Sequence, residues 1–71
     1  MEIDKTLLKE FGLKVQIRRK ELGISQEELA FRAGFHRTYI GMIERAERNI
    51  TLSNLKRLAD ALEIEIKKFF E

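Results

Sequence analysis

Residues 25–44, SQEELAFRAGFHRTYIGMIE, decide the fold of this chain. Ser25 is a preferred helix N-cap residue, and the two glutamates that follow it suit the positive end of a helix dipole. Gly34 supplies the left-handed residue with which many helices end. A second helical pattern starts at His36 and directs two isoleucines inward. The stretch therefore predicts a helix, a tight turn and a second helix.

The corner between these two helices has small and large residues in suitable places. Ala30 is a small residue where two helix backbones must come close, and Phe35 is placed to fill the corner. The outward face of the second helix carries Arg37, Thr38 and Tyr39 near its N-terminus. Such side chains suit the base edges and phosphates of a DNA major groove.

Length and composition exclude several classes of protein. The 71 residues match a single domain, residues 1–71, with one small core. The absence of cysteine and the single histidine exclude disulfides, thiolate metal sites and a zinc centre. No apolar run is long enough to span a bilayer. The first ten residues, MEIDKTLLKE, are unlike a signal peptide, so we expect a cytoplasmic protein with no membrane contact.

The net charge of +2 is unevenly distributed. Residues 14–48 carry eight Lys or Arg against five Glu, a balance of +3, while the two ends together carry six basic against seven acidic residues, or −1. A positive balance in the first two thirds of the chain favours a polyanionic partner. A solvated surface of mixed charge explains the same counts, so charge alone leaves both interpretations open.

Helical spacing of apolar residues continues on both sides of the central unit, and the chain has no proline. A helix is expected over about residues 4–22, where Gly12 allows close packing of a neighbouring helix. Asn49 suits a turn or a left-handed position, Thr51 suits the N-cap of a fourth helix, and a last short helix is expected at about residues 65–70. The pattern predicts an all-α, compact five-helix domain. The expected core consists of Phe11, Val15, Leu29, Phe35, Ile40, Ile43, Leu55, Leu58 and Leu62.

The aromatic pair Phe69 and Phe70 exceeds what one short helix can bury. Adjacent helical positions point about 100° apart, so only one of the two rings should face the core. Exposed aromatic side chains often mark a contact between subunits. We therefore expect a homodimer interface at Phe69, Phe70 and Ile50.

A family resemblance rests on three segments, SQEELAFRAG, RTYIGMIERAERN and TLSNLKRLADAL. Together they resemble the phage-repressor and Cro type of helix-turn-helix domain, also called the xenobiotic-response-element family. The similarity spans residues 11–70. RTYI followed by IER and RN is most similar to the controller proteins of restriction-modification systems. The resemblance implies a repressor-like fold and a small homodimeric regulator that binds operator DNA upstream of its own gene and a nuclease gene.

The resemblance also implies roles for individual side chains. Arg37 and Thr38 match positions that reach base edges, and Arg19 and Glu44 match a buried salt bridge between the first and third helices. Gln26 matches a position that contacts a phosphate and braces the recognition helix. The full set expected to contact the DNA backbone is Gln26, Ser25, His36, Tyr39, Arg45, Arg48 and Asn49.

Structural explanations compete with several of these roles. Arg37 could be an exposed helix arginine, although its guanidinium suits the bidentate recognition of guanine. Tyr39 could be a half-buried core aromatic with a solvated hydroxyl. His36 departs from the hydroxyl or Asp cap commonest in the family, and we expect it to be a cap or a single phosphate contact. Arg18 and Lys14 are further candidates for phosphate contacts.

We therefore expect a sequence-specific, DNA-binding transcriptional regulator, a homodimer on a roughly palindromic operator, of the restriction-modification controller type. The alternative is a protein-interaction module, such as an antitoxin or adaptor, on the same fold. No nucleophile–base pair, metal cluster or phosphate-binding loop is visible in the sequence. We expect no enzyme activity, no metal, no cofactor and no small-molecule substrate.

Overall fold

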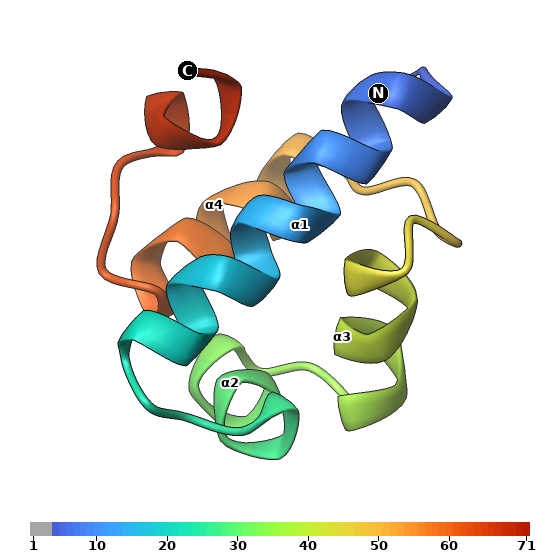
Figure 1. Cartoon of the computed structure of the whole chain (residues 1–71). Helices are drawn as coiled ribbons and strands as arrows, with labels where there is room; N and C mark the ends of the chain where they lie inside the picture. Colours follow the sequence, from blue (N-terminus) through green and yellow to red (C-terminus); the bar gives the residue numbers. More distant parts are fainter. Residues whose placement is uncertain (1–3) are drawn as a thin grey trace.

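A computed structural model describes residues 4–71, which form four α-helices and a C-terminal 3-10 helix (Figure 1). Within this range there is no strand, so the predicted all-α class is confirmed. The predicted count of five α-helices is wrong, because the last segment has only five residues and winds as a 3-10 helix, the form that short helical pieces commonly take. The elements are α1 Lys5–Glu21, α2 Gln26–Ala33, α3 Arg37–Glu44, α4 Leu52–Ala61 and η1 Ile66–Phe70.

Each α-helix is preceded by an N-cap residue whose side chain accepts a hydrogen bond from a backbone N–H of the first turn. This arrangement satisfies one of the backbone N–H groups that have no partner within the helix. At the other end of α2, Gly34 takes the left-handed conformation (φ 77°), as the sequence predicts. The four caps are Asp4, Ser25, His36 and Thr51.

The loop after α3 turns at Ala46 rather than at Asn49. Ala46 has a φ of 59°, whereas the sequence suggested the left-handed position for Asn49. The N–H of Glu47 donates to the carbonyl of Met42 at 2.8 Å, which closes the C-terminus of α3. The left-handed residue is therefore Ala46, because it lies directly after the C-cap of α3.

The core lies beneath α1, which crosses α4 and passes between η1 and α3 (Figure 1). Eight of the nine predicted core residues are buried, and Phe35 is half-buried at the edge of the core. Phe69 closes the core at the η1 end, with its ring edge-on to Phe11 and 4.9 Å between the centroids. The buried apolar residues are Leu8, Phe11, Val15, Leu29, Ala30, Ala33, Ile40, Ile43, Ile50, Leu55, Leu58, Ala59, Leu62 and Phe69.

Gly12 sets the distance between α1 and α3. A Cβ atom at this position would lie 2.5 Å from the carbonyl oxygen of Ile43 and 3.0 Å from that of Glu44. Both oxygens belong to the backbone of α3, so they cannot move aside without displacing the helix. The close approach that the sequence suggested for Gly12 is confirmed, and it places the C-terminal end of α3 against α1.

Replacing Gly12 with alanine should destabilise the protein by about 1–3 kcal/mol, the usual cost of overpacking. Helix propensity alone predicts a gain of about 1 kcal/mol. Urea denaturation followed by circular dichroism measures the difference. Glu10→Ala, on the exposed side of the same helix, is the control and should stay within about 0.5 kcal/mol of the parent. A Gly12→Ala variant more stable than the parent would contradict the close approach.

Candidate nucleic-acid interface

Helix α3, the predicted recognition helix, is anchored by one face and exposes the other. Ile40 and Ile43 are fully buried, which fixes the rotation of the helix about its axis. Arg37 and Thr38, the two predicted base-reading residues, are exposed in the first turn. A short helix held in this way presents its N-terminal side chains outward, as major-groove recognition requires.

His36 holds the N-terminus of α3 in place. Its Nδ1 accepts a hydrogen bond from the N–H of Thr38 at 3.1 Å, and the side chain serves as the N-cap. The role of His36 as a cap is therefore confirmed, while its contact with a phosphate stays a prediction. The bond constrains the backbone of Thr38 and thereby the direction of its side chain.

A hollow of about 240 Å³ lies on this face of the molecule. It is lined by Gln26, Arg37, Thr38, Gly41 and Arg45, so it brings together four residues predicted to contact DNA. Gly41 makes room for the guanidinium of Arg45, because a Cβ atom at this position would lie 3.0 Å from Arg45 Nη1. The hollow has the size and the donor groups to receive phosphate oxygens or base edges.

Arg45 is paired with Glu47, an acidic residue that the sequence did not indicate. Arg45 Nε lies 3.0 Å from Glu47 Oε2, and both side chains are exposed. The hydrogen bond raises the pKa of Arg45 and lowers the pKa of the Glu47 carboxyl. Glu47 therefore occupies the Nε donor of Arg45, which leaves the donors on Nη1 and Nη2 for a phosphate.

Arg19 and Glu44 form an ion pair that joins α1 to the end of α3. Arg19 Nε lies 2.7 Å from Glu44 Oε2, and the two side chains are only 11% and 3% exposed. A second bond links Arg19 Nη2 to Glu44 Oε1 at 3.2 Å, and Arg19 Nη1 donates to the carbonyl of Ile24 at 2.9 Å. The paired fork is the strong bidentate form of an arginine–carboxylate contact.

Gln26 joins this network from the first turn of α2. Its Nε2 donates to Glu44 Oε1 at 3.1 Å, so Gln26 braces α3 from the side. The predicted contact of Gln26 with a phosphate remains a prediction. An amide group has two N–H donors and one carbonyl acceptor, so the bond to Glu44 is compatible with that contact.

Tyr39 is half-buried and hydrogen-bonded at its tip. Its hydroxyl accepts from Asn54 Nδ2 at 3.2 Å, and its ring lies 4.9 Å from that of Phe35. The guanidinium of Arg48 also lies over this ring, 5.8 Å from its centroid. Tyr39 is therefore a half-buried aromatic residue at the edge of the core, as the structural alternative predicts. DNA contact by Tyr39 remains a prediction.

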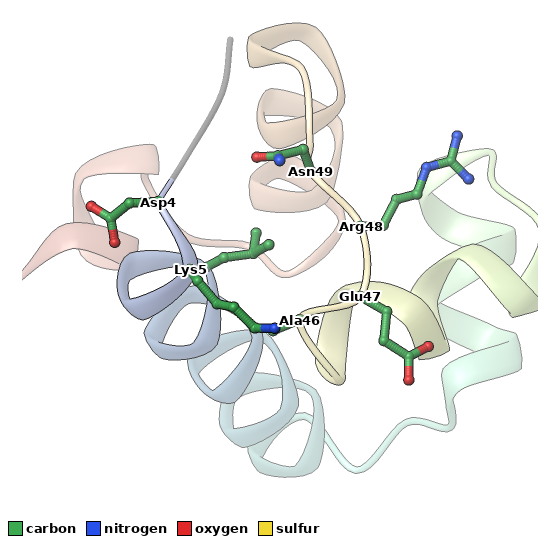
Figure 2. Close-up of a pocket in the computed structure, with 7 residues that line it drawn as sticks. Asp4, Lys5, Ala46, Glu47, Arg48 and Asn49 are labelled. Carbon is green, nitrogen blue, oxygen red and sulfur yellow. The ribbon is translucent and has the colours of Figure 1, made fainter.

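The loop between α3 and α4 borders a second hollow, of about 570 Å³, against the start of α1. Figure 2 shows Arg48 and Asn49 leaving this loop in opposite directions, Arg48 away from α1 and Asn49 on the side where α1 begins. The sequence grouped both with the DNA-backbone contacts. The structure separates them: Arg48 points away from α1 and contacts the Tyr39 ring.

The predicted homodimer residues differ in exposure. Ile50 and Phe69 are each 1% exposed within this chain, so they present almost no surface to a second copy. Their assignment to a subunit interface is wrong, because the loop and η1 fold both side chains into the core of their own chain. Phe70 is 44% exposed, and its place in a subunit interface stays a prediction. Leu52, at 60%, is a further exposed apolar side chain.

Within residues 4–71, no helix has the length and apolar character that crossing a bilayer requires. The same residues contain no cluster of three or more histidine, aspartate or glutamate side chains placed to hold a metal ion.

Comparison with known proteins identifies the family. The model of the helix-turn-helix family matches residues 15–69 of the chain. The chain belongs to the helix-turn-helix family. Control protein C.BamHI of Bacillus amyloliquefaciens is 45% identical over 62 residues, which cover 86% of this chain and 76% of the relative.

Two solved structures resemble this helix-turn-helix protein over most of its length. The restriction-modification controller protein C.AhdI from Aeromonas hydrophila has 44% identity and a TM-score of 0.86, covering 89% of this chain and 96% of that one. The C.Esp1396I tetramer in complex with its natural 35 base-pair operator has 36% identity and a TM-score of 0.86, with coverage of 94% and 88%. The predicted resemblance to the restriction-modification controller proteins is confirmed.

Proposed function

We propose that this helix-turn-helix protein is a sequence-specific, DNA-binding transcriptional regulator of the restriction-modification controller type. One observation carries the proposal: the hollow that places Arg37 and Thr38 beside Gln26 and Arg45 on one exposed face. The face offers two guanidinium groups, a hydroxyl and an amide, the groups with which proteins contact base edges and phosphates. The similar C.Esp1396I structure is a complex with operator DNA, which supports the proposal.

The proposed mode of binding is that of a two-fold symmetric dimer. One α3 helix per subunit enters the major groove, and the two helices are about 34 Å apart on a roughly palindromic operator. Arg37 and Thr38 read base edges. Backbone contacts are assigned to Gln26, His36, Tyr39, Arg45 and Arg48, together with Ser25 and Asn49.

Further parts of the proposal concern the protein as a whole. We propose that residues 1–71 act as one DNA-binding domain in the cytoplasm, without enzyme activity, cofactor or small-molecule substrate. A protein-interaction module on the same fold is the alternative. It would use a different surface, such as the hollow of about 240 Å³ between α1 and η1, which is lined in part by Ile17, Ile64 and Phe69.

The test of the proposed function is binding to the DNA upstream of the protein's own gene. We expect retention on heparin with release at moderate salt, and a footprint with two half-sites one helical turn apart. A shuffled duplex of the same composition is the control. Equal affinity for the upstream and shuffled duplexes would reject sequence-specific binding.

Replacing Arg48 with alanine should weaken binding to every duplex by a similar factor. The loss of one phosphate contact should also reduce the slope of log affinity against log salt by about one unit. Titrations at several salt concentrations measure both effects. Lys20→Ala, which removes an exposed cation at the far end of α1, is the control and should leave the slope unchanged. A loss of discrimination confined to one base pair would instead make Arg48 a base-reading residue.

Replacing Phe70 with serine should weaken the homodimer about tenfold or more, a loss of about 1.4 kcal/mol. Phe70 is an exposed aromatic side chain at the end of η1 and lies outside the core. Sedimentation over a range of concentrations measures the dissociation constant. Phe31→Ser is the matched control, because Phe31 is 82% exposed on α2. An unchanged dimer in Phe70→Ser, or dissociation in Phe31→Ser only, would remove Phe70 from the interface.

A further inference from the structure

Arg57, on α4, holds the turn of the helix-turn-helix unit from outside that unit. Its Nε donates to the carbonyl of Ala33 at 3.1 Å, and its Nη2 donates to the carbonyl of Gly34 at 2.6 Å. These carbonyls close α2, where the last oxygens have no partner within the helix. A cation at this point also meets the negative end of the helix dipole. Arg57 therefore fixes the chain where α2 ends.

The same guanidinium also stacks on an aromatic ring in the turn that precedes α3. Arg57 lies on the ring of Phe35, 4.1 Å from its centroid. Phe35 in turn packs against Tyr39 in the first turn of α3, with 4.9 Å between the centroids and 60° between the planes. We refer to Arg57, Phe35 and Tyr39 as the clamp. The two predicted base-reading residues, Arg37 and Thr38, lie between its two aromatic residues in the sequence.

A second bond from α4 supports the clamp. Asn54 Nδ2 donates to the Tyr39 hydroxyl at 3.2 Å. Asn54 and Arg57 are three positions apart on α4, so they share one face of that helix. This face of α4 therefore touches α3 directly at Tyr39 and the turn before α3 at Gly34 and Phe35.

Gly34 provides the space in which the clamp fits. A Cβ atom at Gly34 would lie 2.7 Å from Arg57 Nη2, and the φ of 77° at this position disfavours other residues. Lysine could not replace Arg57, because an ammonium group has no planar fork that both bridges two carbonyls and stacks on a ring. The arrangement requires arginine on α4 and glycine in the turn.

We propose that Arg57 is a positioning residue for DNA recognition, which sets the direction of α3 through the clamp. The inference rests on the proposed function. Its guanidinium is engaged by Ala33, Gly34 and Phe35, so its contribution is to hold the first turn of α3 rather than to contact DNA. A small change in this direction displaces Arg37 and Thr38 from the base edges, where recognition tolerates only about 0.5 Å or 10–20° of error.

The first test needs no DNA. The protein contains one tyrosine, so the tyrosine ring resonances belong to Tyr39 alone and report on the clamp. Arg57→Lys keeps the charge and removes the fork, and Lys56→Met is the control because Lys56 pairs with Asp60 within α4. In Arg57→Lys we expect NMR shifts of the Tyr39 ring and of the Arg37 and Thr38 amides. Unchanged Tyr39 resonances would overturn the proposal.

The second test compares cognate and shuffled duplexes. Arg57→Lys and Arg57→Met should each lower the ratio of the two affinities about tenfold, the size of one weakened base contact, without changing the salt slope. A slope reduced by about one unit in Arg57→Met would make Arg57 a phosphate contact. A lower Tm with an unchanged ratio would make it purely structural. Either result would overturn the proposal. If the parent discriminated no duplex, the proposed function would fail, while the NMR comparison would still decide whether Arg57 positions α3.

Discussion

Replacing Glu44 with alanine is expected to lower the free energy of unfolding by about 3–5 kcal/mol, because it leaves the charge of Arg19 buried and unpaired. The two side chains are almost fully enclosed, and Glu44 also accepts the hydrogen bond from Gln26. A domain of this size has a total stability of about 4–11 kcal/mol. The variant should therefore be close to unfolding at room temperature, as urea denaturation will measure.

Two further variants separate a buried pair from ordinary surface charge. Glu21→Ala breaks the exposed pair with Arg18 and should cost at most about 1 kcal/mol. The double variant Arg19→Met/Glu44→Leu removes both charges and should recover most of the lost stability. If Glu44→Ala cost no more than Glu21→Ala, the network would not hold α3 against α1.

Replacing Arg37 with alanine is expected to reduce discrimination at one base pair by about 1–3 kcal/mol. Arg37 is exposed in the first turn of α3, and the ion pairs found within residues 4–71 do not include it. A guanidinium that makes no ion pair within its own chain can offer its fork to a guanine edge. Affinities for a set of duplexes with single base-pair changes measure the effect.

Two variants serve as controls for Arg37→Ala. Arg48→Ala should lower the affinity for all duplexes by a similar factor, whereas Arg37→Ala should reduce the effect of base-pair changes at one position in each half-site. Arg37→Lys keeps the charge without the planar fork and should restore the affinity for shuffled DNA but not the discrimination. An unaltered profile in Arg37→Ala would remove Arg37 from the base-reading set.

Local sequence signals predicted much of this fold. Ser25 and Thr51 begin helices because their side chains cap the first turn, and Gly34 ends α2 because glycine adopts a left-handed conformation at little cost. These effects depend only on neighbouring residues. The Arg19–Glu44 pair came from the family resemblance, since a contact between α1 and α3 leaves no local signal.

The errors have a common physical origin in tertiary placement. Ile50 lies in an extended connection without periodicity, so its burial depends on where the loop crosses the core. The sequence showed that only one ring of the C-terminal aromatic pair should be buried, but not which one. The clamp around Arg57 could not be predicted from the sequence for the same reason. An arginine on α4 that faces a glycine in the turn appears in the sequence only as one more charged helix residue.

The α3 face of this protein is proposed to read DNA. NMR titration of the parent protein with a duplex selected for binding shows which residues contact the DNA. We predict that the amide shifts concentrate at Gln26, Arg37, Thr38 and Arg48, while residues of η1 on the opposite side of the molecule remain unchanged (Figure 1). Shifts confined to the hollow between α1 and η1, or the same weak shifts with a shuffled duplex, would show that α3 does not read DNA.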